Sequence, residues 1–177
     1  MKRKLVPWVF EGLSPGAQIL ELGPGPGLTT ELLQGVTPRL IAIEIDFALA
    51  RRAADRLRGT DARVIQGDAS ALPFADSGFT SAVCIAMLHH LRTPALQDRM
   101  FREVRRVLRP GGMFVGADSL NSWAMRLLHV ADTHTPIDPA ALPARLEAAG
   151  FRCISIERGF RMFRFRAIAG KACQRAV

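Results

Sequence analysis

The sequence of 177 residues contains no tyrosine, only three cysteines and only three lysines, and it has no long apolar run. No stretch reaches the roughly 18 apolar residues that a membrane-spanning helix needs, so we expect no membrane span. The first ten residues, MKRKLVPWVF, begin with basic residues as an export signal does. Their apolar part is short, contains Pro7 and is followed by Glu11, so we expect no export signal and a cytoplasmic protein.

The three cysteines, Cys84, Cys153 and Cys173, are odd in number and widely spaced. No pair has the spacing of metal ligands, so no metal site is expected, and neither is a disulfide framework. A reducing cytosol is the default compartment for such a chain.

Positive charge is abundant, with a formal net charge of +8, and almost all of it is arginine. A basic surface could meet nucleic acid, anionic lipid or an acidic small molecule. The simpler interpretation, which we favour, is a composition bias of the genome together with solvated faces. The charge alone therefore names no partner.

Short apolar runs alternate with helical patterns along the chain, without internal repeats. The expected strands cover 17–23, 39–46, 62–68, 79–88 and 113–118. The expected helices cover 28–35, 47–59, 93–112, 120–131 and 139–149. The tail, 151–170, reads as two further strands around a tight turn at Arg158-Gly159.

This order of elements predicts the fold class. Five apolar strands alternating with helices indicate a parallel sheet covered on both faces, and the closely spaced final pair must be antiparallel. We therefore expect an α/β, Rossmann-like, doubly wound seven-stranded sheet, mostly parallel with one antiparallel strand in a C-terminal hairpin. Residues 1–177 would form a single domain with a short N-terminal segment, 1–16. Ligands of such sheets bind at the carboxyl ends of the strands.

A glycine-rich turn follows the first expected strand, in the stretch ILELGPGPGLTTELL at 19–33. Gly23, Gly25 and Gly27 permit positive φ and a close approach of a ligand to the backbone. The next helix presents free N–H groups and the positive end of its dipole. The GxGxG spacing differs from the GxGxxG of dinucleotide folds, and no phosphate-loop Gly-Lys-Ser/Thr follows. We favour a ligand-binding turn over a purely structural one.

Two carboxylates at the ends of neighbouring strands sharpen this interpretation. Glu44 ends the second strand, where it can accept hydrogen bonds from both hydroxyls of a ribose. Asp68 ends the third strand, where it could accept a hydrogen bond from an adenine amine. Each acid alone is more often a solvated residue or a helix cap, as we expect Asp46 to be. Their combination is much more specific.

Several stretches, in order and at matching spacing, resemble the class I S-adenosylmethionine-dependent methyltransferases, most closely the small-molecule branch with its quinone C-methyltransferase-like enzymes. These stretches are ILELGPGPG (19–27), IAIEID (41–46), GDASALPFADSGFTSAV (67–83), MLHHL (87–91) and VLRPGGMFV (107–115). The resemblance implies S-adenosylmethionine as cofactor and methyl transfer to a small-molecule or lipid-like acceptor.

The resemblance also implies roles for single residues. Glu44 would hold the ribose hydroxyls, Ile45 would pack on the adenine and Asp68 would bind the adenine amine. The residues implied in cofactor binding are Glu21, Gly23, Pro24, Gly25, Gly27, Glu44, Ile45, Asp68, Ala69, Cys84 and Ile85. The glycine loop offers no lysine clamp, and a neutral-to-zwitterionic cofactor needs none.

The sequence departs from the family pattern in places. The fourth strand usually opens Phe-Asp in this branch, and here it opens Phe79-Thr80; we expect that missing acid to be structural. The N-terminal segment, 1–16, is too short for the helical lid that the family often carries, and the expected substrate-side segment, 119–149, is modest. The site is therefore expected to be open or to be completed by a second subunit of a homo-oligomer. The arginines of the tail strand either line that cleft or, as we favour, are solvated.

Methyl transfer from a sulfonium is an in-line displacement in which positioning does much of the work. A general base would lie near the methyl group, and His89 and His90, after the fourth strand, are the catalytic candidates. One of them could instead face the core. Asp118 ends the fifth strand, where it would contact substrate or cap a helix. Cys84, inside an apolar strand, is expected in the core rather than as a nucleophile.

Two other functions stay open. A nicotinamide oxidoreductase would share the glycines and Glu44, although the glycine spacing and the LPFADSGF, MLHHL and LRPGG stretches speak against it. A non-catalytic cofactor-binding or interaction protein would suit the short N-terminus. DNA enzymes that methylate amino groups would show an Asn-Pro-Pro-aromatic stretch after the fourth strand, and this sequence has none. Only the basic charge would then favour a nucleic-acid substrate, so we do not expect one.

Overall fold

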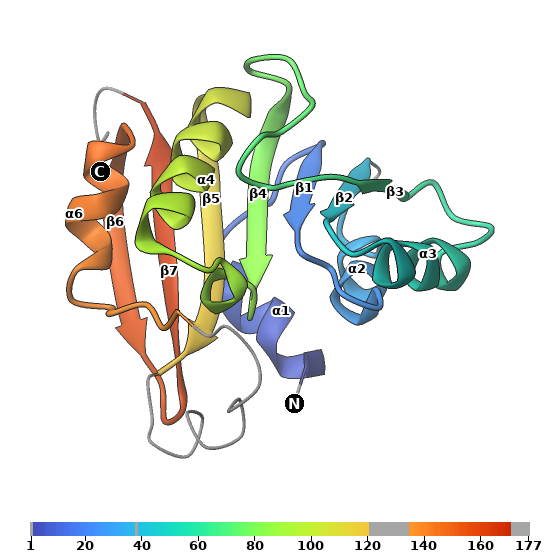
Figure 1. The fold of residues 1–177 in the computed structure, drawn as a ribbon, viewed down its shortest axis with the longest axis horizontal. Helices are drawn as coiled ribbons and strands as arrows, with labels where there is room; N and C mark the ends of the chain where they lie inside the picture. The colour runs from blue at the N-terminus through green and yellow to red at the C-terminus, as the bar shows by residue number, and fades with distance from the viewer. Residues whose placement is uncertain (1, 38, 121–134, 171–177) are drawn as a thin grey trace.

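The computed structural model describes residues 2–37, 39–120 and 135–170, and its centre is one seven-stranded sheet with helices on both faces (Figure 1). The strands are β1 (Ile19–Leu22), β2 (Leu40–Glu44), β3 (Arg63–Gln66), β4 (Phe79–Ile85), β5 (Leu108–Ser119), β6 (Phe151–Arg158) and β7 (Met162–Ala169). The helices are α1 (Lys2–Phe10), α2 (Leu28–Leu33), α3 (Phe47–Arg56), the 3₁₀ turn η1 (Leu88–His90), α4 (Pro94–Val107) and α6 (Leu142–Ala148).

The strand order is β3-β2-β1-β4-β5-β7-β6, and only β7 is reversed. This confirms the predicted fold class. Because β1 to β5 are parallel, the turns that follow them meet at one edge of the sheet, the lower edge in Figure 1. We call it the carboxyl-terminal edge.

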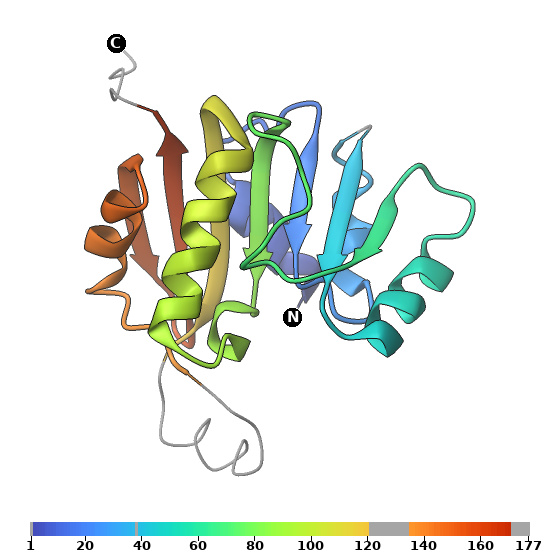
Figure 2. The ribbon, with the colours of Figure 1, turned by 45° about the horizontal axis from the view of Figure 1, so that its top comes forward.

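Two apolar layers hold the sheet. Helices α4 and α6 lie on one face, in a layer that includes Phe114 and Phe165, and α1 and α2 lie on the other, in a layer that includes Val83 and Val115 (Figure 2). Strands covered on both faces read as continuous apolar runs, which is why the sequence locates them well.

The short N-terminal segment forms a helix that the sequence pattern did not reveal. Helix α1 contains Pro7, yet Leu5, Val6 and Val9 on its inner side are buried in the layer over β5 and α2. Pro7 lies inside this helix rather than in its first turn, so it removes one intrahelical hydrogen bond and disfavours the helix. Tertiary burial therefore stabilises a helix of nine residues that would be marginal alone.

Two arginines of β7 attach this helix to the sheet. The buried Arg164 guanidinium donates to the Trp8 carbonyl oxygen and, at 2.8 Å, to Glu11; its Nε donates to Glu157 at 2.9 Å. It also lies 5.1 Å from the centre of the Trp8 ring. Arg166 donates to the carbonyl oxygen of Glu11 at 2.6 Å. Arg164 is buried against protein partners, so neither expectation for the tail arginines, solvation or a substrate cleft, holds for it; Arg166 is only partly buried.

The helix expected over 93–112 is shorter, and a strand replaces its end. The Thr93 hydroxyl accepts a hydrogen bond from the Leu96 N–H at 3.2 Å and starts α4, as a helix cap does. The helix ends at Val107 because Pro110 disfavours helical conformation in the residue before it. Leu108 already pairs with β4.

Part of the predicted substrate-side segment, 121–134, lies outside the described residues, and so does most of the helix expected over 120–131. Helix α6 corresponds to the helix expected over 139–149. None of the described helices is long and apolar enough to cross a membrane.

Candidate functional site

The glycine turn at the carboxyl-terminal edge has left-handed backbone at all three glycines, with φ of 64° at Gly23, 56° at Gly25 and 83° at Gly27. A Cβ on Gly23 would lie 2.2 Å from the Met87 side chain, and one on Gly27 would lie 3.0 Å from Ala53. A Cβ on Gly25 would meet nothing within 4 Å. Protein atoms therefore fill the space beside Gly23 and Gly27, whereas the space beside Gly25 is open to a ligand.

Glu44 connects the ends of β1 and β2 through its side chain. The residue is only 7% exposed; its Oε2 accepts a hydrogen bond from the Gly25 N–H at 2.9 Å and its Oε1 accepts one from the Asp46 N–H at 3.1 Å. Each carboxylate oxygen has a second lone pair, so Glu44 can accept two further hydrogen bonds. Asp46 also caps α3 by accepting from the Leu49 N–H at 2.8 Å, as predicted.

Glu21 and Pro24 support the turn from within. Glu21 is buried in β1, and its Oε1 accepts a hydrogen bond from the Thr29 hydroxyl in α2. The buried Pro24 accepts through its carbonyl oxygen from the Gly27 N–H at 3.1 Å. These bonds tie β1 to α2, while a direct contact of either residue with a cofactor stays a prediction.

An apolar side chain and a second carboxylate flank Glu44. Ile45, directly after β2, is 66% exposed. Asp68 follows β3, which pairs with β2, and it accepts from the Ser70 N–H at 2.7 Å. Ala69 beside it is buried. The structure thus brings the three side chains predicted to bind the nucleoside to one edge.

Cys84 and Ile85, at the end of β4, belong to the two apolar layers. Cys84 is fully buried and free, and burial raises the pKa of its thiol, with further increases from Asp118 and Glu21. A protonated thiol inside the core is a poor nucleophile, as expected for Cys84. Cys153 is disulfide-bonded, contrary to the expectation for the cysteines.

The two histidines after β4 have different surroundings. His89 is buried, and its Nδ1 lies 2.6 Å from Oδ1 of Asp118 at the end of β5. The backbone N–H of His89 also donates to Oδ2 of Asp118, at 3.3 Å. Because a carboxylate only accepts, Nδ1 carries the proton of this bond. His90 is exposed, and its ring centre lies 4.2 Å from that of His89.

Sequence reasoning missed the pairing of His89 with Asp118. It gave Asp118 a substrate contact or a helix cap, and neither includes a histidine partner. The two residues are 29 positions apart, and their only shared signal is that each follows a strand of the predicted sheet. Since β4 and β5 are neighbours, that signal was enough to place both at one edge, though not to pair them.

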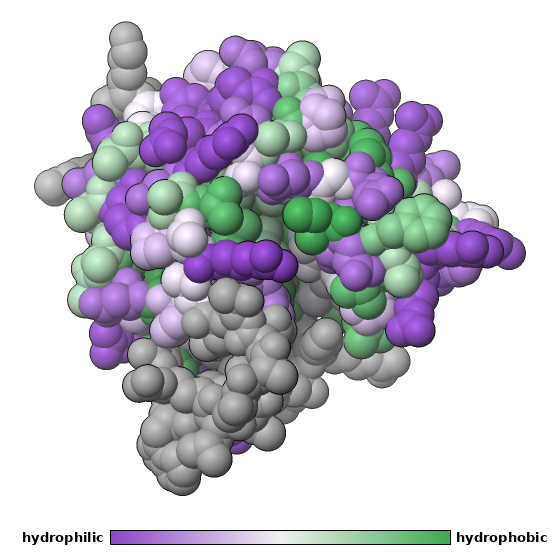
Figure 3. All heavy atoms as spheres, viewed as in Figure 1, coloured by the Kyte–Doolittle hydropathy of each residue, from purple (hydrophilic) through white to green (hydrophobic). Residues whose placement is uncertain are grey.

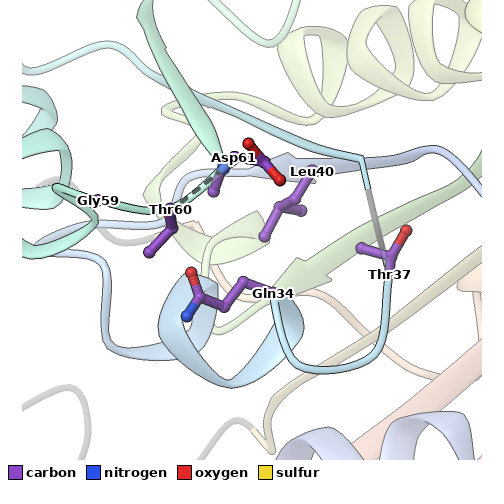
Figure 4. Close-up of a pocket in the computed structure, with 7 residues that line it drawn as sticks. Gln34, Thr37, Leu40, Gly59, Thr60 and Asp61 are labelled. Carbon is purple, nitrogen blue, oxygen red and sulfur yellow. Dashed lines mark hydrogen bonds between the residues drawn. The ribbon is translucent and has the colours of Figure 1, made fainter.

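Other features of the described residues do not coincide with this site. A hollow of about 320 Å³ lies at the opposite edge, at the starts of β2 and β3 (Figure 4). Its lining residues are Gln34, Thr37, Leu40, Gly59, Thr60, Asp61 and Ala62. Within the described ranges, no group of three or more His, Cys, Asp or Glu side chains could hold a metal ion.

The sheet order and the glycine turn define a Rossmann-like protein, and the ends of β1 and β2, with the carboxylate of Glu44, are its candidate site for a nucleoside. The chain matches the model of the methyltransferase domain family over residues 20–116, more than half of its length. It therefore belongs to the class I S-adenosylmethionine-dependent methyltransferases. Family membership overturns the nicotinamide oxidoreductase alternative.

Relatives and solved structures agree with this family. The ubiquinone/menaquinone biosynthesis C-methyltransferase UbiE of Legionella pneumophila (strain Corby) is 32% identical over 136 residues, which cover 73% of this chain and 48% of that protein. The chain spans about half the length of the curated relatives it matches.

Two solved structures show the fold. A Pyrococcus horikoshii protein has a TM-score of 0.80 at 21% identity, covering 94% of this chain and 88% of that one. A Haemonchus contortus phosphoethanolamine N-methyltransferase, solved with S-adenosylhomocysteine, has a TM-score of 0.80 at 12% identity, covering 96% and 52%.

The residues at the carboxyl-terminal edge fit S-adenosylmethionine, the methyl donor of this family. The open space at Gly25 admits a ligand against the backbone, Glu44 has two acceptor positions left, and Ile45 presents an apolar surface. These are complements of a ribose and an adenine. The same turn contains no lysine or arginine, which suits a cofactor without phosphates.

Proposed function

We propose that this protein transfers a methyl group from S-adenosylmethionine to a small-molecule or lipid-like acceptor, as one domain over residues 1–177 in the cytoplasm. The observation that carries the proposal is the state of Glu44. It is a buried carboxylate that bonds to the backbone N–H groups of Gly25 and Asp46 and keeps two acceptor positions beside open space. Burial in a low dielectric strengthens any hydrogen bond that a ligand hydroxyl donates there.

The neighbouring residues take the other parts of the cofactor in this proposal. Ile45 packs on one face of the adenine, and Asp68 accepts from its exocyclic amine beside the backbone of Ala69. The turn from Gly23 to Gly27 lies against the methionine part, with Glu21 and Pro24 fixing its shape. Cys84 and Ile85 form the apolar floor at the end of β4.

When bound, S-adenosylmethionine supplies a methyl group already activated on a sulfonium. The protein then has to hold the acceptor in line and remove its proton where it has one. We assign proton removal to the two histidines after β4. Asp118 accepts a hydrogen bond from Nδ1–H of His89 and so fixes the orientation of the imidazole ring, as in other carboxylate-oriented histidines. His90, which is exposed, can contact an acceptor directly.

The class of acceptor is supported by the relatives rather than by a pocket. The similar Legionella protein is named for ubiquinone and menaquinone biosynthesis, and the Haemonchus structure is a phosphoethanolamine N-methyltransferase. Both names point to small or lipid-like acceptors for those proteins. We extend that class to this chain, and we keep nucleic acid as the less favoured acceptor. A homo-oligomer that completes the open site belongs to the same proposal.

A calorimetric titration with S-adenosylhomocysteine, with NADH as the comparison, tests the cofactor. Binding of the first without the second is the expected result. Transfer of a labelled methyl group to a panel of quinols, phenols and amines then tests the catalysis. Cofactor binding without transfer to any acceptor of the panel would favour a non-catalytic cofactor-binding protein of the same fold. No binding of S-adenosylhomocysteine would overturn the proposal.

A further inference from the structure

The turn of the β6–β7 hairpin carries an aromatic side chain that the fold does not use. Phe160 is 96% exposed, so its ring adds nothing to either apolar layer. The turn itself is fixed, because the Gly159 N–H donates to the Met162 carbonyl oxygen at 2.8 Å. A phenylalanine held in water by an ordered turn is available for contact with something outside the described chain. We call residues 158–161 the hairpin tip.

The hairpin tip is positively charged. Arg158 and Arg161 flank Phe160, are exposed, and have no ion pair with any described residue. The two acids nearby, Glu11 and Glu157, are both bonded to the buried Arg164. Arg166 lies beside the same two acids, so two guanidinium groups balance two carboxylates in this cluster and leave no net negative charge to neutralise the arginines of the tip.

The hairpin tip lies at the carboxyl-terminal edge, next to the end of β5. Ser119 pairs with Met162 across the β5–β7 ladder, and the Leu120 N–H donates to the Arg161 carbonyl oxygen at 3.0 Å. Figure 1 shows the turn near the bottom of the molecule, on the side toward which the arrows of β1 and β4 point. The tip thus shares an edge with the proposed cofactor site.

The same edge holds most of the other exposed apolar side chains. Large exposed hydrophobic residues of the described ranges are Leu28, Val36, Ile45, Phe47 and Phe160. All except Val36 follow β1, β2 or β6 at the carboxyl-terminal edge. Where Figure 3 shows the described residues of one face, hydrophilic and apolar areas are interspersed. A contact made here would therefore use a few anchoring side chains rather than one broad patch.

We propose that the hairpin tip is a contact for an anionic lipid surface. An aromatic ring suits the boundary between headgroups and acyl chains, and arginine pairs with phosphate oxygens through its planar fork. Docking in this way turns the carboxyl-terminal edge, and with it the proposed acceptor site, toward the lipid. The contact does not depend on methyl transfer, so it stands or fails separately.

The contact is expected to be weak and reversible. One ring and two arginines provide less anchoring than the two lipid chains or the polybasic patch that stable attachment requires. The arginine part falls as salt shortens the screening length. Binding should therefore require anionic lipid and decrease when the ionic strength is raised.

Co-sedimentation of the full chain with vesicles tests this proposal. Vesicles of phosphatidylcholine mixed with phosphatidylglycerol should bind the protein, and vesicles of phosphatidylcholine alone should bind it much less. Phe160→Ser should lower the partition coefficient about tenfold. The double variant Arg158→Ser/Arg161→Ser should lower it roughly 25-fold, from about fivefold for each arginine near the surface.

Matched controls come from the opposite edge of the sheet. Arg39 and Arg63 are exposed just before β2 and at the start of β3, and Val36 is half exposed nearby. The double variant Arg39→Ser/Arg63→Ser removes the same charge as the tip variant and should change partition by less than about twofold. The same small effect is expected for Val36→Ser. Titration with S-adenosylhomocysteine, expected to be unchanged by the tip variants, shows that each protein is folded.

Three results would overturn the proposal. Absence of binding to the mixed vesicles would remove the contact itself. Equal binding to both kinds of vesicle would remove the charge argument. Equal losses in the tip variants and the opposite-edge variants would show that general basicity, and not the hairpin tip, attracts the protein.

Discussion

Two buried charged side chains, Glu44 and Arg164, are held in different ways. Arg164 is enclosed by partners from the protein itself: the carboxylates of Glu11 and Glu157, and both the carbonyl oxygen and the ring of Trp8. Burial alone would lower the pKa of Arg164, but hydrogen bonds with the two carboxylates raise it. All the described partners of the Arg164 guanidinium thus belong to the protein itself.

Glu44 has no such enclosure. Its described partners are two backbone N–H groups, and each carboxylate oxygen keeps a lone pair beside the open space at Gly25. The comparison separates a structural charge from a binding charge. A charge that meets only protein partners fastens elements together, whereas a charge held by backbone donors with capacity left is ready for a ligand. Each of the following changes would break or sharpen that distinction.

Arg164→Met should have the largest effect, and it should fall on stability. Removing the guanidinium breaks its bonds to Trp8, Glu11 and Glu157, and we expect the free energy of unfolding to fall by about 2–4 kcal/mol. Because the two carboxylates are partly exposed, this loss should be smaller than that of a wholly buried pair. Denaturant unfolding measures it. Arg161→Met, at the exposed hairpin turn, is the control and should stay within about 0.5 kcal/mol. A similar small change for Arg164→Met would contradict the structural role.

Glu44→Gln should act mainly on binding. The amide can accept from only one of the two backbone N–H groups and offers fewer acceptors to a ribose, so we expect S-adenosylhomocysteine affinity to fall by about 1–3 kcal/mol. Calorimetric titration measures the loss. Glu31→Gln, a change of an exposed glutamate on α2, serves as the control. Equal affinities for wild type and Glu44→Gln would remove Glu44 from the cofactor site.

Gly25→Ala, compared with a control glycine, distinguishes the cost of backbone strain from the effect of filling the space beside Gly25. Left-handed φ costs a residue with a Cβ about 1–2 kcal/mol, and the new methyl group would enter the open space. Gly111→Ala is a matched control, because Gly111 has a φ of 79° and nothing within 4 Å of an added Cβ, but lies in β5 away from the turn. Both variants should lose similar stability, and only Gly25→Ala should lose S-adenosylhomocysteine affinity. Loss of affinity in both would attribute the effect to strain.

Glu157→Gln should give the smallest effect, visible in acid. Hydrogen bonds from Arg164 hold the pKa of Glu157 below its usual value. A depressed folded pKa stabilises the protein above the unfolded pKa, and this contribution is lost as the pH falls through the folded value. The variant should therefore be less stable than wild type at neutral pH and approach it as the pH falls below the range of an ordinary glutamate. Unfolding curves at several pH values would show a constant gap if the pairing did not exist.

The features that could be predicted from the sequence are those that short stretches of the chain determine. The strands appear as apolar runs and the glycine turn as a spacing, and Glu44 could be placed because a strand end has a fixed position in a parallel sheet. Helix α1 could not be found in this way, because its anchors on β7 lie more than 150 residues along the chain. The same limit applies to the His89–Asp118 pair, because the two residues meet only where β4 and β5 lie side by side in the sheet.

A crystal structure of the protein with S-adenosylhomocysteine bound tests the central claim most directly. We predict that both ribose hydroxyls donate to Glu44 and that the ligand passes the backbone of Gly25 without displacing it. A ligand bound elsewhere, or one whose ribose has no contact with Glu44, would contradict the claim that this carboxylate is held for binding.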